Sequence, residues 1–133
     1  MTIAVDFDGT IVDHQYPEIG KEKPFAIQTL KQLQLEGNRL ILWTSREDEL
    51  LDEAIAFCHE RGLDFYAVNS NEPADALFHK NTTKVIADVY IDDHNLGGIP
   101  GWGEIYEIIT QKRAEHHAAH ENGKKKSFWP WKR

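Results

Sequence analysis

The sequence has few of the features that mark secreted or membrane proteins. Its 133 residues include one cysteine, Cys58, which excludes an intrachain disulfide framework and a metal site built from several thiolates. No apolar run approaches the ~20 residues that a membrane-spanning helix needs. A secretory signal begins with a basic segment that is followed by a long apolar one. The chain instead starts MTIAVDFDG, with acidic side chains in this region. We therefore expect a cytoplasmic protein without a transmembrane segment.

Basic residues are also scarce, 15 against 22 acidic ones, which gives a net charge of −7. The segment KKKSFWPWKR at the end holds five of the basic residues and no acidic one, so residues 1–123 carry −12. A body this acidic repels polyanions, which argues against general nucleic-acid binding. The acidic residues are either solvated surface or converge on a cation, and only their spacing can support the second reading.

The chain has the length of a single domain. Its hydrophobic content of 41% and aromatic content of 11% argue against disorder. We expect one folded domain over residues 1–120. The basic and aromatic segment 121–133 is expected to be a flexible tail.

Short apolar segments alternate with segments of helical periodicity. The apolar segments predict strands at residues 2–6, 39–43, 64–68 and 87–91. Helical spacing predicts helices at 24–37, 47–61 and 103–119 and a short helical turn at 73–78. Continuously apolar strands separated by helices are typical of a parallel sheet covered on both faces. The expected fold is α/β, with a three-layer Rossmann-like core.

Acidic residues follow the first and the fourth predicted strand. Asp6 and Asp8 come after the first, and Asp92 and Asp93 after the fourth. In an open α/β sheet, ligands bind beyond the carboxyl ends of the strands, so these side chains are expected at one edge. Unpaired carboxylates repel one another by ~4 kcal/mol at 4 Å and an effective dielectric constant near 20. A hard divalent cation such as Mg²⁺ would relieve this repulsion.

Each of these features also has an ordinary structural explanation. An Asp-Gly pair usually marks a turn, and Asp92-Asp93 could be a solvated loop. Thr44 and Ser45 follow the second strand, and Ser45 with Asp48 resembles the start of a capped helix. A functional site is favoured because all of these groups fall at predicted strand ends.

These residues together resemble the motifs of the haloacid dehalogenase superfamily of phosphohydrolases. The first motif is an apolar strand that ends in DFDGT, Asp6 to Thr10. The second is LILWTS, with Thr44 at the expected place, and the third is Lys84 ahead of the strand ADVYIDD. The similarity covers residues 2–96. It implies an α/β hydrolase core and, in detail, a small member without a cap domain.

The resemblance implies a role for each motif residue. Asp6 would attack phosphorus and form an aspartyl-phosphate, and Asp8 would act as general acid and base. Thr44 would donate its hydroxyl to a phosphoryl oxygen. Lys84 would place a positive charge beside the phosphoryl group, with Lys80 as the alternative motif lysine.

The resemblance also implies a magnesium site and a phosphate cradle. The metal residues would be Asp6, Asp8 through its backbone carbonyl, Asp92 and Asp93. The residues expected to contact phosphate or substrate are Thr44, Ser45, Lys84, Gly9, Thr10 and Arg46. The loop residues Asp13, His14 and Tyr16 either contact substrate or belong to an ordinary surface loop.

Members of this superfamily usually recognise substrate with a cap domain inserted between motifs. Here the two connections concerned, residues 10–24 and 68–84, are too short for one. An open site suits a phosphorylated macromolecule or a phosphorylated small molecule, or it is closed by another copy in a homo-oligomer. Two alternatives remain. One is a receiver-like phosphoacceptor, although receivers carry their acid pair first and their lysine after the threonine. The other is a catalytically weak binding protein on the same fold.

Overall fold

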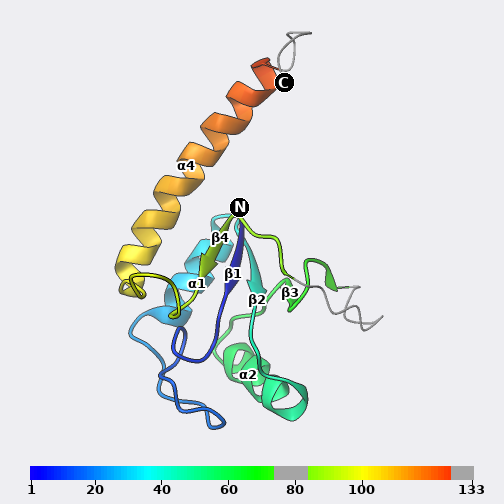
Figure 1. Ribbon diagram of the computed structural model, residues 1–133, viewed down its shortest axis with the longest axis vertical. Coiled ribbons are helices and arrows are strands. Elements are labelled where there is room, and N and C mark those ends of the chain that lie inside the picture. The colour runs from blue at the N-terminus through cyan, green and yellow to red at the C-terminus, as the bar shows by residue number, and fades with distance from the viewer. Residues whose placement is uncertain (74–83, 127–133) are drawn as a thin grey trace.

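The computed structural model describes the backbone of residues 1–73 and 84–126, and the side chains of these residues as far as Glu121. A parallel four-stranded sheet lies at its centre, in the order β3-β2-β1-β4 (Figure 1). Its strands are β1 (Thr2–Val5), β2 (Arg39–Leu42), β3 (Ala67–Val68) and β4 (Val89–Ile91). The prediction of an α/β fold with a parallel sheet is confirmed, and the strand order is that of the doubly wound Rossmann sheet.

The larger core lies on one face of the sheet. Alternate strand residues such as Ile3 and Val5 point to this face, as a side-chain period of two requires. Three helices contribute to the same core: α1 (Ala26–Leu35), α2 (Asp48–Glu60) and α4 (Trp102–Lys126). The helices bury their apolar faces against the strands, and this packing fixes where the carboxyl ends of the strands lie.

The other face of the sheet carries a smaller apolar cluster, formed by Ala4, Ile41, Ala67 and Val85. Trp43, Tyr66 and Tyr90 pack against it. The predicted helical turn at 73–78 lies outside the described residues apart from Pro73.

Most elements differ from the sequence prediction by one or two residues at an end, and two of them differ by more. The third strand covers Ala67–Val68 rather than 64–68, because β3 is an edge strand that pairs with β2 alone. Helix α4 continues to Lys126, so residues 121–126 of the expected flexible tail are helical. No proline lies between Pro100 and Pro130, which lets the intrahelical hydrogen bonds continue. Residues 127–133 lie outside the described part.

The connection from β1 to α1, residues 6–25, is a loop held by isolated bridges at Asp8, Val12 and Glu22. It contains no inserted domain, in agreement with the predicted absence of a cap at this position. Among the described helices, none combines the length and apolar character that crossing a membrane requires.

Candidate functional site

A cavity of about 500 Å³ opens at the carboxyl ends of β1, β2 and β4. Its lining includes five residues predicted from the sequence: Asp6, Asp8, Thr44, Ser45 and Asp92. It also includes His14, Tyr16, Trp43 and His94. Residues separated by more than 80 positions thus meet because three parallel strands end at the same edge.

Thr10 connects the loop after β1 with the loop after β4. Its hydroxyl donates to Asp6 Oδ2 at 3.1 Å and accepts from the backbone N–H of Asp93 at 3.0 Å. The Thr10 carbonyl in turn accepts a hydrogen bond from Trp102 Nε1 at 3.1 Å. Thr10 is fully buried and does not line the cavity, contrary to the expected substrate contact. It orients the acidic side chains instead.

Gly9 is also buried and is not among the residues that line the cavity. Its φ of +82° is a left-handed conformation that favours glycine. A Cβ atom at this position would lie 2.2 Å from Asp93 Oδ2. Glycine is therefore required here so that the Asp93 carboxylate can approach the backbone of the first motif, and the expected contact of Gly9 with substrate is not observed.

The acidic residues produce a strong local field. Burial and the negative charge of Asp92 raise the pKa of Asp6 from an ordinary 3.8 to about 7, although the Phe7 amide and the Thr10 hydroxyl donate to it. A hydrogen bond between the side chains of Asp6 and Asp93 contributes to the rise. One ligand atom each of Asp92, Asp93 and His94 lies within 4.8 Å of the others. These groups could hold a metal ion.

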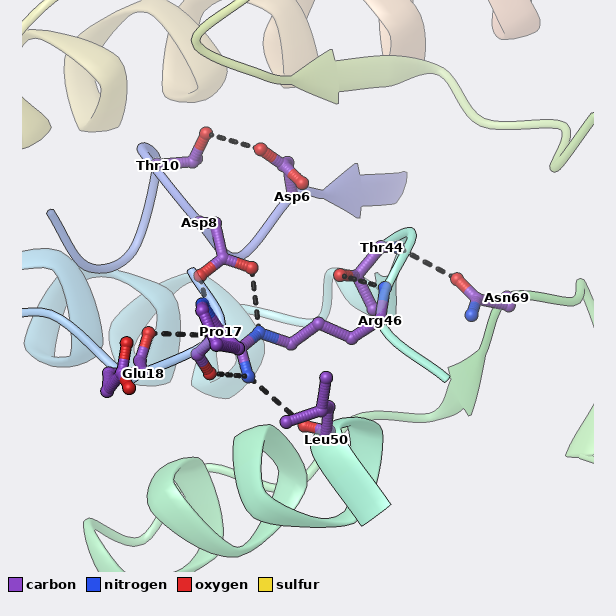
Figure 2. Close-up of polar contacts among 9 residues, drawn as sticks. All are labelled: Asp6, Asp8, Thr10, Pro17, Glu18, Thr44, Arg46, Leu50 and Asn69. Carbon is purple, nitrogen blue, oxygen red and sulfur yellow. Dashed lines mark hydrogen bonds and ion pairs between the residues drawn. The ribbon is translucent and has the colours of Figure 1, made fainter. Parts of the chain in front are cut away.

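Arg46 occupies a different place from the one expected of a substrate-binding arginine. Its side chain is 0% exposed and forms a two-pronged ion pair with Asp8, with Nε at 2.7 Å and Nη2 at 2.8 Å from the two carboxylate oxygens (Figure 2). Asp8 raises the pKa of Arg46 by accepting these hydrogen bonds. The buried guanidinium does not line the cavity, so the predicted contact with phosphate is replaced by a contact with the proposed acid/base residue.

Three backbone carbonyls complete the surroundings of Arg46. They belong to Pro17 at 3.1 Å, Glu18 at 3.0 Å and Leu50 at 3.4 Å (Figure 2). Arg46 therefore ties the loop after β1 and the start of α2 to Asp8. This network could not be read from the sequence, in which Arg46 follows Thr44 and Ser45 as an ordinary charged loop residue.

Thr44 is positioned by hydrogen bonds on both sides. Its backbone N–H donates to Asn69 Oδ1 at 2.8 Å, and its hydroxyl accepts from the backbone N–H of Arg46 at 3.2 Å (Figure 2). Asn69 has a φ of +53°, an uncommon conformation that is often found at functional sites. Thr44 lines the cavity with its hydroxyl oxygen fixed by the contact with the Arg46 N–H, and its expected hydrogen bond to a phosphoryl oxygen stays a prediction.

The motif lysine is not placed in the cavity. Lys84 is exposed, and its Nζ lies 4.9 Å from the centre of the Tyr90 ring. Lys80 lies outside the described residues. Among the described residues that line the cavity there is neither lysine nor arginine.

The aromatic side of the cavity was only partly anticipated. His14 and Tyr16 were candidates for substrate contact, and both line it, whereas Asp13 pairs with Lys23 at 3.4 Å. Trp43 was interpreted only as part of an apolar strand. His94 was not singled out, although a histidine directly after two aspartates is a recognisable metal-ligand signal.

Comparison with known proteins gives the family but not the activity. A search of solved structures matches a conserved protein from Bacteroides thetaiotaomicron with 61% identity and a TM-score of 0.78, covering 84% of this chain and 91% of that one. The chain belongs to the same family as that protein. No family model matches the sequence, and no curated protein matches it. The comparison therefore supports the α/β fold, and the chemistry must be argued from the residues.

Proposed function

We propose that this protein is a magnesium-dependent phosphohydrolase that cleaves phosphomonoesters through an aspartyl-phosphate on Asp6. The supporting observation is the meeting of Asp6, Asp8, Thr44 and Asp92 in one cavity at the carboxyl edge of the sheet. These are the positions at which the sequence resembles the haloacid dehalogenase superfamily.

The donor set fits a hard divalent cation. Asp6, Asp92 and Asp93 offer carboxylate oxygens, the ligands that Mg²⁺ prefers. The pKa of Asp6, raised to about 7 by burial and by the charge of Asp92, reflects negative charge that a cation would compensate. When bound, Mg²⁺ would neutralise charge on the phosphoryl oxygens.

In this proposal Asp6 is the nucleophile and Asp8 is the general acid and base. A carboxylate oxygen of Asp6 attacks phosphorus, and the new P–O bond forms as the bond to the leaving oxygen breaks. Asp8 donates a proton to that oxygen. In the second step Asp8 takes a proton from water, whose oxygen attacks phosphorus and releases Asp6 and inorganic phosphate. The Thr44 hydroxyl donates a hydrogen bond to a phosphoryl oxygen in both steps. The resemblance assigns the balancing positive charge to Lys84 or Lys80, although Lys84 does not line the cavity.

One observation favours a second candidate, a phosphoacceptor that holds its phosphate. The ion pair with Arg46 occupies both carboxylate oxygens of Asp8, which would slow the proton transfers of the second step. Against this, the sheet order β3-β2-β1-β4 differs from the 2-1-3-4-5 order of flavodoxin-like receivers. A stable acyl-phosphate after treatment with acetyl phosphate would favour the phosphoacceptor. The cytoplasmic location and a homo-oligomeric state remain predictions.

The decisive experiment measures phosphate release from a broad panel of phosphomonoesters with Mg²⁺ and with EDTA. We expect turnover only with the metal. Asp6→Asn should lower it by about 1000-fold or more, as losses of catalytic nucleophiles do. Asp52→Asn is the matched control, because Asp52 is an exposed residue of α2 outside the cavity. Full activity of Asp6→Asn would refute the nucleophile assignment.

A further inference from the structure

We propose that the leaving group of the substrate carries a flat aromatic or heteroaromatic ring, which stacks on Tyr16 and Trp43. The inference rests on the proposed phosphohydrolase function and adds the substrate class to it. The lining residues of the cavity are of two chemical kinds, carboxylates and hydroxyls on the one hand and the rings of Tyr16, Trp43 and two histidines on the other.

The cavity has room for more than a phosphate group. A volume of about 500 Å³ lies in the range of sites that enclose whole small molecules. Ring-bearing ligands are held in such sites by stacking on aromatic side chains, which tolerates many ring types. The lining therefore matches a phosphate joined to a planar group of moderate size.

Tyr16 is a large aromatic residue that does not belong to the hydrophobic core, because 49% of it is exposed. One side of it is nevertheless fixed. The Arg46 guanidinium carbon lies 5.2 Å from the centre of the Tyr16 ring, and Arg46 also donates to the carbonyls of Pro17 and Glu18 next to it. The ring is thus held from behind while it lines the cavity. Such preorganisation lowers the entropic cost of binding.

Trp43 comes from a different and equally fixed element. It directly follows β2, its backbone N–H donates to the carbonyl of Val5 at 2.8 Å, and its side chain packs against the apolar cluster on the second face. Two aromatic groups from separate segments therefore border the same space. Each of them offers an aromatic face to a ring bound in this cavity.

Charge restricts the ring further. The described lining contains the carboxylates of Asp6, Asp8 and Asp92 and no lysine or arginine. Outside its phosphate, the substrate is therefore expected to be uncharged or positively charged, since a second anionic group would be repelled.

The test compares two substrates that release the same kind of primary alcohol, adenosine 5′-monophosphate and ribose 5-phosphate. They differ in the presence of the base. We expect the wild-type kcat/KM to be about tenfold or more higher for the nucleotide, which is the lower range of base stacking on an aromatic residue. Tyr16→Ala should bring this ratio close to one, whereas Tyr16→Phe should retain it.

Tyr66→Ala is the matched control. Tyr66 also lies against an arginine, with Arg39 Cζ at 3.9 Å from its ring centre, but it is outside the cavity lining. It should leave the ratio unchanged. Trp43→Leu, which keeps an apolar side chain on the strand, provides a second variant in case Tyr16→Ala does not fold.

The outcomes separate the two proposals. Equal kcat/KM for both wild-type substrates would overturn the ring inference and leave the phosphohydrolase intact. If no phosphomonoester is hydrolysed, the proposed function fails, and calorimetric binding of the same two compounds to Asp6→Asn tests the inference alone. Equal affinity for both, or an unchanged preference in Tyr16→Ala, would then overturn it.

Discussion

The buried pair of Arg46 and Asp8 leads to a prediction about stability. Arg46→Met replaces the guanidinium with an apolar chain of similar length. It leaves the Asp8 carboxylate, which is 12% exposed, without its partner and removes the donor to three backbone carbonyls. Removing one member of a buried ion pair typically costs about 3–5 kcal/mol. We expect a loss of about 4 kcal/mol, or about 15 °C in Tm for a chain of this size.

A double-mutant cycle isolates the pair itself. Asp8→Asn leaves Arg46 charged and buried, so it should cost a similar amount. The double variant Arg46→Met/Asp8→Asn contains no unpaired buried charge. We therefore expect its loss to fall short of the sum of the single losses by about 2 kcal/mol or more.

Urea unfolding followed by circular dichroism measures all four proteins, and equal m-values would validate the comparison. Arg61→Met is the control. Arg61 is exposed, and its Nε lies 3.9 Å from Glu22, so its loss should cost less than about 1 kcal/mol. A cost for Arg46→Met as small as that of the control, or strict additivity in the cycle, would refute the role of the pair.

Three further predictions concern other sites. The folded-state pKa of Asp6 is raised from 3.8 to about 7, so the folded protein binds this proton more tightly than the unfolded chain does. Stability in EDTA should therefore fall as the pH rises from about 4 to about 7, and urea titrations of Asp6→Asn should show a flatter profile. Gly9→Ala should destabilise by about 2 kcal/mol or more in the same assay, because its Cβ would collide with Asp93 and its φ is left-handed; an unchanged unfolding midpoint would contradict the close approach. Burial raises the pKa of the Cys58 thiol to about 12, so a thiol reagent should label it only after denaturant is added; rapid labelling of the native protein would show that α2 opens readily.

The sequence predicted the parallel sheet and most of its acidic edge for a simple reason. Apolar periodicity locates strands and helices, and parallel strands of one sheet place their carboxyl ends together. Asp6, Asp8, Thr44 and Asp92 could therefore be assigned to one site without knowledge of the contacts between them.

The sequence predictions that were wrong concern the placement of individual side chains. Thr10 and Arg46 were expected to face substrate. Instead, the Thr10 hydroxyl donates a hydrogen bond to Asp6, and the Arg46 guanidinium donates one to Asp8. Periodicity carries no information about such contacts. Tyr16 belongs to an irregular loop, whose path is determined by hydrogen bonds to Arg46. A sequence pattern could raise it as a candidate but could not place it.

Helix α4 is long enough to have two parts that differ in stability. Its first turns are buried through Trp102, Ile105 and Ile109. Residues 117–121 are exposed, and they follow His116, whose Nε2 lies 3.6 Å from Asp88 Oδ1. Figure 1 shows the distal part running away from the sheet. A helix segment without tertiary contacts is marginally stable in water. Amide hydrogen exchange along α4 should therefore change from global to local opening near His116, so the helix melts gradually at one end and cooperatively at the other.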